Sequence, residues 1–187
     1  PVGESRPAPG RVEQDPVEIL DSIRGALSDL MKAAGDITPV AAGLATQRAS
    51  VVCWDRVTGE ALSPVISWQD RRQEPFLPPH HENAKEIHRR TGLRLSPHYG
   101  AGTLRWCLET QPAVSSALAD HRLACGPLAS FLLFHLVRER PLLVDPANGC
   151  RTLLWNLEQG GWDDDLPDWA GVPRSVLPSP APTCFPF

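Results

Sequence analysis

Five side chains near the middle of the sequence have types that suit the binding of a hydroxylated small molecule: Arg48, Trp68, Asp70, His98 and Tyr99. The Arg48 guanidinium carries a planar fork of donors for hydroxyl or phosphate oxygens. Trp68 offers an apolar plate to the C–H face of a polyol or sugar, and the Asp70 carboxylate accepts hydrogen bonds from hydroxyls. His98 and Tyr99 precede a glycine-rich helix start, which alone is a weak signal.

The two strongest candidates also fit structural roles. Arg48 is equally suited to pairing with a carboxylate at the surface, and Trp68 to packing in the core. His80 and His81 resemble a metal-binding pair, but no third ligand stands at a useful spacing. We therefore interpret both histidines as loop surface and predict no metal site. The sequence contains no P-loop, GxSxG or HExxH motif.

Length and composition predict one globular domain. The chain has 187 residues, 42% of them hydrophobic and 21% charged, which is enough for a core of its own. A formal net charge of −4 argues against nucleic-acid binding, which requires a basic face. No apolar run approaches the ~20 residues of a membrane span, and the N-terminus lacks a signal-peptide core. The five cysteines form no CxxC pair and indicate buried free thiols, so we expect a cytoplasmic protein.

The elements that would position these residues are helices and strands. Asp15 suits an N-cap, Pro16 suits the first helical position, and apolar residues of helical period continue to Gly35. The apolar run 40–46 predicts a buried strand, whose carboxyl end would place Arg48 in a ligand-binding crevice. The later elements expected are a hairpin of strands 50–54 and 61–67, helices at 83–90, 100–112, 113–120 and 127–139, two extended pieces within 142–157 and a short helix within 161–178.

An α/β sheet usually opens with a strand. Here the first helix has no strand before it, and strong strand candidates are few. The pattern therefore predicts an α/β domain that lacks its opening strands, and a strand 40–46 with an unpaired edge.

Several blocks of the sequence, in their order along the chain, together carry a resemblance to one protein family. The blocks are "GRVEQDPVEIL", "TQR", "VVCWDRVTGEAL", "ISWQDRR", "TGLRLSPHYGAGTLRWCLE", "VDPANGCRTLLWNL" and "WDDDL…GVPRSVLP". They resemble the FGGY carbohydrate kinases, and within that family the glycerol-kinase-like branch. The resemblance implies a ribonuclease-H-like (actin-like ATPase) fold and the ATP- and Mg²⁺-dependent phosphorylation of a polyol or sugar.

The resemblance also implies roles for individual residues. Arg48 matches an arginine that, with a following glutamate, grips glycerol hydroxyls, but Ala49 stands in the place of that glutamate. Trp68 matches the tryptophan that packs against the glycerol carbons. His98 stands where the family has a substrate-binding tyrosine, and Tyr99 where it has phenylalanine. These differences favour a polyol other than glycerol.

Other parts of such a kinase would lie outside residues 1–187. The resemblance implies that the phosphate-binding DxGT hairpin, the catalytic aspartate and the C-terminal ATP-binding domain are among them, so we expect no catalytic residue here and no turnover by this chain alone. Residues 1–187 are then part of the N-terminal, substrate-binding domain, and the resemblance is compatible with a homo-oligomer of the whole protein. The alternative is a non-catalytic binding or interaction module, which Ala49 favours, as does Ala129, where the family tends to have aspartate.

Overall fold

The computed structural model describes residues 2–184, except for the side chains of Pro78 and Pro79. The main sheet of this part has four strands in the order β1-β3-β2-β4, and each neighbouring pair is antiparallel. The two longer strands, β2 (Val51–Asp55) and β4 (Leu123–Pro127), pair along their whole length. The two shorter strands are β1 (Glu13–Gln14) and β3 (Val65–Ile66).

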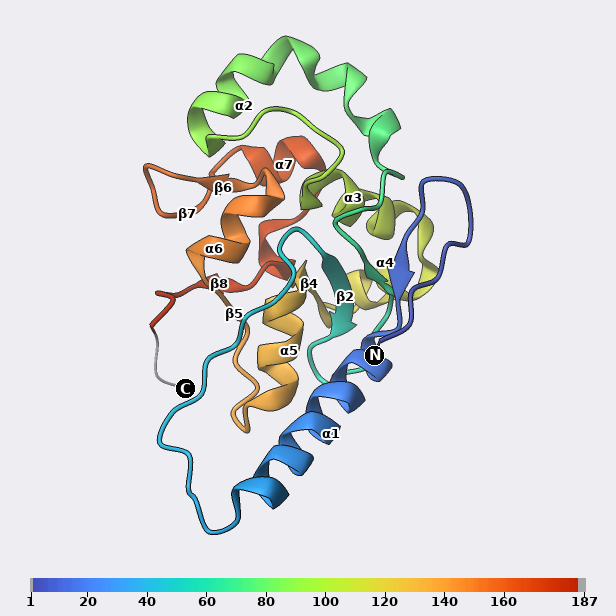
Figure 1. The fold of residues 1–187 in the computed structure, drawn as a ribbon. Coiled ribbons are helices and arrows are strands. Elements are labelled where there is room, and N and C mark those ends of the chain that lie inside the picture. The colour runs from blue at the N-terminus through green and yellow to red at the C-terminus, as the bar shows by residue number, and fades with distance from the viewer. Residues whose placement is uncertain (1, 185–187) are drawn as a thin grey trace.

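Helices cover both faces of the sheet (Figure 1), and β2 and β4 are therefore buried along their whole length. Side chains alternate between the two faces of a strand. Cys53 and Cys125 pack into the core with α3 and α4, whereas Trp54 and Ala124 pack into a second core with α1 and α5. The chain therefore has the predicted α/β character. The helices are α1 (Pro16–Ala34), α3 (Gly100–Thr110), α4 (Pro112–Ala119) and α5 (Leu128–Leu136).

Helix α1 confirms the prediction for residues 16–34. The Asp15 carboxylate accepts a hydrogen bond from the Val17 amide at 2.8 Å, and Pro16 occupies the first helical position. Ile19 and Leu20 are buried against the sheet. The second half of the helix extends away from the sheet, and most of its side chains are exposed (Figure 1).

The predicted strand at 40–46 is wrong. These residues form neither strand nor helix, and the side chains of Val40 and Leu44 are exposed. A strand is stable only when a neighbour satisfies its backbone groups and covers a face, and within residues 2–184 no strand pairs with this segment. The expected strand edge at 40–46 is therefore absent as well.

Strand β4 is missing from the sequence-based prediction. It is apolar but contains Gly126 and Pro127, which usually interrupt strands. Pro127 is tolerated because β4 lies at the edge of the described sheet and Pro127 is its last residue. The predicted hairpin is confirmed, since β2 and β3 are antiparallel neighbours with Val51 opposite Ile66.

The C-terminal third contributes two small sheets and several short helices. Strands β5 (Leu143–Val144) and β8 (Ser179–Pro180) pair in parallel, and β6 (Trp155–Asn156) and β7 (Gly161–Trp162) form an antiparallel hairpin. The remaining helices are α2 (Ala84–Thr91), α6 (Pro146–Gly149), α7 (Leu166–Ala170) and the 3₁₀ turns η1 (Glu74–Phe76), η2 (Pro78–Asn83), η3 (Cys150–Thr152) and η4 (Arg174–Val176).

The interpretation of His80 as loop surface is wrong. Its ring lies 4.4 Å from the Phe76 ring and 3.9 Å from the Trp169 ring, measured between centroids, and the residue is buried. Burial lowers the pKa of His80, and the nearby Arg105 charge acts in the same direction. His81, by contrast, is exposed as expected.

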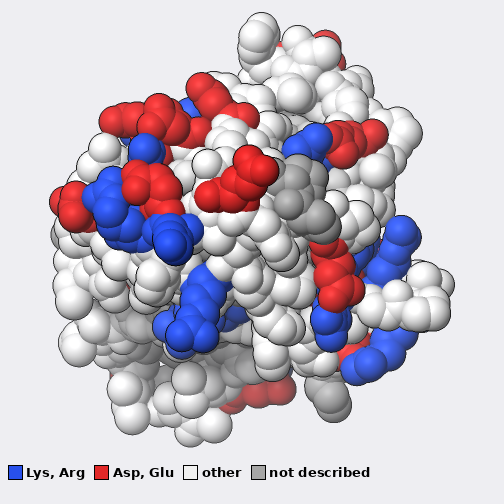
Figure 2. Space-filling view, turned by 90° about the horizontal axis from the view of Figure 1, so that it is seen from above, with Lys and Arg blue, Asp and Glu red and all other residues white. Residues whose placement is uncertain are grey.

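The surface seen from above α2 carries acidic and basic groups side by side, with no continuous basic area (Figure 2). Within residues 2–184, no helix is both long enough and apolar enough to cross a membrane.

Candidate substrate pocket

Three of the five predicted site residues meet in one pocket with a volume of about 220 Å³. Arg48 and Trp68 approach it from segments on either side of the β2–β3 hairpin, and His98 from the loop before α3. The Nδ1 atom of His98 lies 3.5 Å from the Trp68 carbonyl oxygen. Trp68 is 47% exposed, so its indole is accessible rather than packed in the core. The complete lining is Gln47, Arg48, Ala49, Trp68, His98 and Arg151.

A hydrogen-bonded turn, rather than a strand end, positions Arg48. The hydroxyl of buried Ser50 donates to the Gln47 side-chain oxygen at 3.0 Å and accepts from the Trp68 amide at 3.0 Å. The Gln47 side-chain nitrogen donates to the Gln14 side-chain oxygen at 2.6 Å. The turn is thereby tied both to β1 and to the segment after β3. Arg48 itself is exposed and faces the pocket between these anchors.

Arg151 is the pocket residue that the sequence analysis missed. It lies in η3, which directly follows α6. The Asp145 side chain caps α6 by accepting a hydrogen bond from the Asn148 amide at 3.2 Å. The Arg151 guanidinium lies 5.0 Å from the centre of the Tyr99 ring. Its Nε atom is buried and has no hydrogen-bond partner among the described residues. The "PANGCR" segment signals a turn, but nothing local in the sequence indicates that its arginine lines the same pocket as Arg48.

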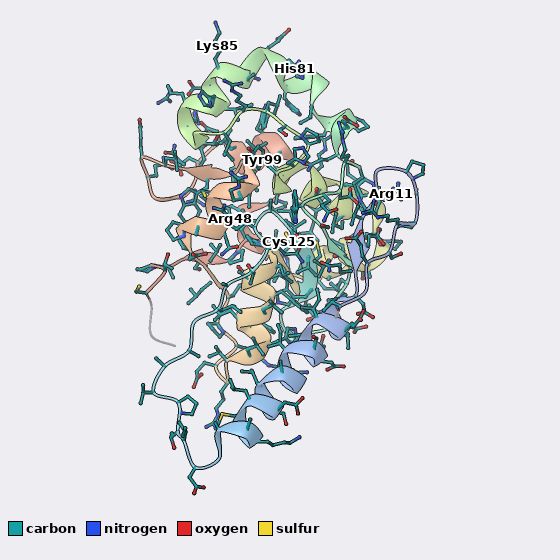
Figure 3. The ribbon with its side chains drawn as sticks, in the orientation of Figure 1. Arg11, Arg48, His81, Lys85, Tyr99 and Cys125 are labelled. Carbon is teal, nitrogen blue, oxygen red and sulfur yellow. The ribbon has the colours of Figure 1, made fainter. Side chains whose placement is uncertain are left out.

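Tyr99 is therefore beside the pocket rather than in its lining. It is half-buried and precedes the first residue of α3. In the view of Figure 3, the labels of Tyr99 and Arg48 lie close together and Arg11 lies at the right. Through its contact with Arg151, the Tyr99 ring supports a guanidinium that lines the pocket.

Asp70 is not brought into the pocket. Its carboxylate accepts four hydrogen bonds, one from the Val12 amide at 2.6 Å and three from Arg72. Arg72 also donates to Glu13 at 2.7 Å and stacks 4.3 Å from the centre of a Trp106 ring. Both charged side chains of the Asp70–Arg72 pair are 1% exposed. This geometry gives Asp70 a structural position between β1 and the segment after β3.

The charges around the pocket are predominantly positive. Burial raises the pKa of the Cys150 thiol, whereas the positive charges of Arg151 and Arg48 act in the opposite direction. Both guanidiniums thus lie close enough to Cys150 to act on its ionisation. Of the residues that the structure describes, no Asp or Glu belongs to the pocket lining.

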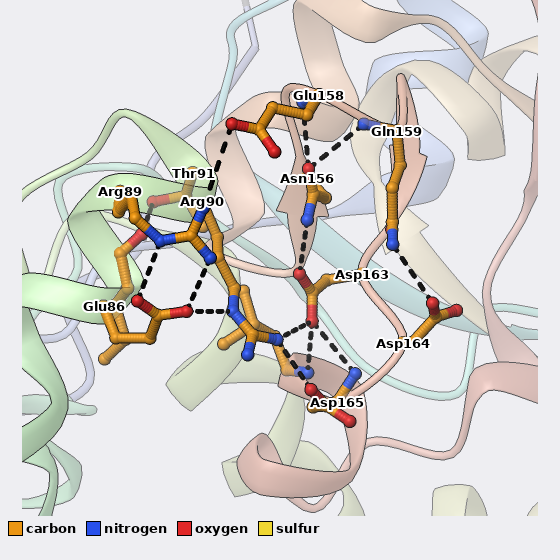
Figure 4. Close-up of polar contacts among 12 residues, drawn as sticks. Glu86, Arg89, Arg90, Thr91, Asn156, Glu158, Gln159, Asp163, Asp164 and Asp165 are labelled. Atoms are coloured by element: carbon orange, nitrogen blue, oxygen red, sulfur yellow. Dashed lines mark hydrogen bonds and ion pairs between the residues drawn. The ribbon is translucent and has the colours of Figure 1, made fainter.

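The β6–β7 hairpin, which follows Arg151 in the chain, is tied to α2 by a polar network (Figure 4). Arg90 donates to Asp163 at 3.0 Å, to Asp165 at 2.7 Å and to Glu86 at 2.7 Å. Asp163 also accepts from the Asn156 side chain at 2.8 Å. Burial acts to raise the pKa of Asp163, but these hydrogen bonds and those from two backbone amides lower it below its usual value.

Ala129 lines a different hollow. That hollow has a volume of about 340 Å³ and is largely apolar, with Leu133, Leu143 and Asp145 among its lining residues. Ala129 adds a methyl group to it, and no carboxylate is present at this position of α5.

Comparison with known proteins identifies the chain. The family model described as the N-terminal domain of the FGGY family of carbohydrate kinases matches residues 1–183. The chain belongs to this family. Among similar FGGY proteins, a glycerol kinase from Paracidovorax citrulli is 37% identical over 97% of this chain, and one from Thermus brockianus is 37% identical over 95% of it. The chain spans only 37% of the length of either relative.

Solved structures of FGGY kinases confirm the predicted ribonuclease-H-like α/β fold. The glycerol kinase of Plasmodium falciparum, solved with ADP, superposes with a TM-score of 0.90 at 25% identity, over 96% of this chain and 37% of that chain. The xylulose kinase of Rhodospirillum rubrum gives a TM-score of 0.84 at 27% identity, over 97% of this chain and 37% of that chain.

Proposed function

We propose that residues 1–187 form the acceptor-binding part of an ATP-dependent kinase that phosphorylates a hydroxyl of glycerol or a related polyol or sugar. The observation that carries this proposal is the pocket in which Arg48, Trp68 and His98 converge within an FGGY N-terminal domain. The proposal includes a cytoplasmic location and ATP and Mg²⁺ as cofactors of the whole protein. The groups that bind those cofactors are proposed to lie mostly beyond this chain, which spans 37% of its relatives.

The pocket residues suit the acceptor chemistry. A guanidinium donates to hydroxyl oxygens in a fixed geometry, so Arg48 would orient the polyol. The accessible Trp68 indole would cover its C–H face and exclude water from it. His98 would add one further polar contact at the rim. Asp70 remains a predicted substrate ligand only from the sequence pattern, since its oxygens are occupied by Val12 and Arg72.

Ligand binding to the 187-residue chain tests this assignment. We expect saturation-transfer NMR with glycerol, xylitol and sorbitol to show binding of at least one polyol. Arg48→Ala should weaken it by about one to two orders of magnitude, because an unpaired polar group in the bound state costs ~1–3 kcal/mol. Arg174→Ala, which removes an exposed arginine paired with Asp164, is the matched control. Equal binding by the wild-type chain and the Arg48→Ala variant would contradict the proposal.

A coupled assay for ADP release tests whether the isolated chain catalyses phosphoryl transfer. We expect no ATP-dependent turnover by the isolated chain with any polyol, because positioning and charge neutralisation of the phosphates need groups assigned to other parts of the protein. Turnover well above that of heat-inactivated protein would show that the chain carries its own catalytic groups.

The alternative function, a non-catalytic binding or interaction module, is favoured by two small residues, Ala49 in the pocket and Ala129 in α5. The flanking reading frame distinguishes the two functions. A DxGT segment before residue 1 and a Gly-Asp segment after residue 187 support the kinase, and their absence from the extended frame supports the module.

A further inference from the structure

The pocket is rich in hydrogen-bond donors. Arg48 and Arg151 both line it, and within residues 2–184 neither has an Asp or Glu oxygen within ion-pair distance. Some arginines elsewhere in the chain do form ion pairs, as Arg72 does with Asp70 and Glu13. The buried Nε of Arg151 has no hydrogen-bond partner in the described part of the chain, although its guanidinium lies against the Tyr99 ring. A buried donor without an acceptor is unfavourable, so a ligand that supplies one would be bound preferentially.

The same pocket is poor in acceptors. A hydroxyl group donates as well as accepts, so a neutral polyol needs acceptors on the protein. The Gln47 side-chain oxygen already accepts from Ser50, and its nitrogen donates to Gln14. Ala49 presents a methyl group. Among the lining side chains, the acceptors left are the second lone pair of the Gln47 oxygen and one nitrogen of the His98 ring in its neutral form.

Asp145, a carboxylate close to Cys150, forms no ion pair with Arg48 or Arg151 among the described residues. Asp145 lies close enough to act on the pKa of Cys150, as both arginines do. Its oxygens accept from the Asn148 amide and side chain, at 3.2 and 2.7 Å, and from the Thr183 hydroxyl at 3.3 Å. Asp145 lines the neighbouring apolar hollow and not this pocket. The two guanidiniums are therefore available to a ligand.

We infer that this pocket binds an acceptor molecule that carries an oxyanion beside its hydroxyls, either a polyhydroxy carboxylate or a polyol monophosphate. The oxyanion would lie between Arg48 and Arg151, where it meets donors in the planar arrangement that arginine offers to carboxylate and phosphate. The hydroxylated chain would extend along Trp68. The inference rests on the proposed function, because it specifies the substrate class of the same pocket.

Calorimetric titration of the 187-residue chain with matched ligands tests the inference. D-gluconate and D-sorbitol differ at the terminal carbon, as D-glycerate and glycerol do, and glycerol 3-phosphate provides the phosphate arm. At low ionic strength we expect each acid to bind at least about tenfold more tightly than its neutral partner, since hydrogen bonds to charged groups are the stronger class. The preference should shrink as salt is added. Tighter binding of glycerol 3-phosphate than of glycerate would assign phosphate as the oxyanion, and the reverse would assign carboxylate.

Four variants test whether Arg48 and Arg151 cause the preference for acids over neutral polyols. Arg48→Gln and Arg151→Gln should each bring the ratio of gluconate to sorbitol affinity close to one, whereas Arg151→Lys keeps the charge and part of the preference. Arg174→Gln removes the same charge at an exposed site paired with Asp164 and should leave the ratio unchanged. Arg48 is exposed, so its replacement keeps the test valid even where an Arg151 variant folds poorly.

A carboxylate placed in the pocket provides the converse experiment. Ala49→Glu puts an acceptor beside the arginines, so gluconate should bind at least about tenfold more weakly and glycerol should not. Equal binding of gluconate and sorbitol would overturn the inference and leave the polyol pocket standing. Absence of binding by all five ligands would overturn the proposed function too. Acetate or inorganic phosphate binding as tightly as the hydroxylated acids would show an unspecific anion site and also overturn the inference.

Discussion

Ala49 adopts a left-handed backbone conformation, with φ at 66°, in the wall of the pocket. A residue with a Cβ is unfavourable there, and glycine is the residue that tolerates this region best. The surrounding turn compensates, because Ser50 links Gln47 to Trp68 through hydrogen bonds of 3.0 Å on each side. The chain therefore keeps a strained residue next to Arg48, where backbone direction decides which way the guanidinium leaves the turn.

Replacing Ala49 with glycine should stabilise the chain. The left-handed conformation costs a Cβ-bearing residue ~1–2 kcal/mol, and the larger entropy that glycine loses on folding offsets ~0.5–1 kcal/mol of the gain. We expect the free energy of unfolding in urea to rise by about 0.5–1 kcal/mol. Ala26→Gly, in the exposed part of α1, is the control with the opposite sign and should lower it by about 1 kcal/mol. A destabilised Ala49→Gly variant would show that no strain is stored at this residue.

The short strand β1 is held to the sheet by charge as well as by backbone pairing. It pairs with β3 over two residues, Glu13 opposite Ile66 and Gln14 opposite Val65. Arg72 joins Glu13 to Asp70, and Asp70 accepts from the amide of the residue before β1. Burial acts against the charge of Arg72, but its two carboxylate partners raise its pKa above the usual value. These contacts also fix the segment that carries Trp68.

Asp70→Ala should destabilise the whole sheet edge. The variant leaves the buried Arg72 guanidinium with only Glu13 as a carboxylate partner, and breaking a buried pair by removing one member costs ~3–5 kcal/mol. Urea unfolding followed by circular dichroism measures this loss. Asp29→Ala removes an exposed carboxylate that pairs with Lys32, and it should change stability by less than about 0.5 kcal/mol. If both variants were equally stable, the Asp70–Arg72 pair would contribute nothing to the fold.

The elements that the sequence predicts are those whose signals are local. Helix α1 has its cap at Asp15, its first-turn Pro16 and its apolar stripe within one segment. The run 40–46 has an equally apolar pattern, but a strand depends on a partner elsewhere in the chain, and pattern alone does not report whether one is present. Strand β4 is the opposite case, a strand that the sequence pattern does not predict. Gly126 and Pro127 suggest a break, but burial on both faces maintains the strand.

The pocket shows the same boundary between local and distant information. Arg48, Trp68 and His98 were predicted from residue type and resemblance, and the structure places all three around one volume. Arg151 lies over a hundred positions after Arg48, and its exposure to the pocket depends on η3 packing beside Tyr99. Asp70 has the right chemistry for a hydroxyl ligand, but a tertiary partner, Arg72, occupies its oxygens. The sequence pattern therefore does not predict the balance of charges in the pocket, because that balance depends on tertiary contacts.

For the whole molecule, two histidines on opposite sides of the sheet couple folding to pH. His80 packs between Phe76 and Trp169, and His135 lies 4.4 Å from the Phe131 ring, measured between centroids. Burial lowers the pKa of both histidines. The charged groups that face them are arginines, which act in the same direction: Arg105 for His80, and Arg24 and Arg140 for His135.

Stability should therefore fall as the pH is lowered from about 7.5 to 5. In this window the unfolded chain binds protons at histidine near pH 6.5, while His80 and His135 in the folded chain stay neutral to lower pH. The unfolded state then holds more protons than the folded state, so the free energy of unfolding rises with pH. The rise ends above about pH 6.5, where histidine is neutral in the unfolded chain as well. The pKa of Glu86 is about 2 in the folded chain, so this carboxylate changes the pH dependence of stability only below this window.

Urea unfolding across the window, on the wild-type chain and on His80→Phe, measures the slope of stability against pH. We expect the phenylalanine variant to be less pH-dependent because the aromatic site keeps an apolar ring that takes up no proton. A variant slope as steep as that of the wild type would mean that His80 titrates alike in both states, and a fall in stability towards higher pH would reverse the sign of the coupling.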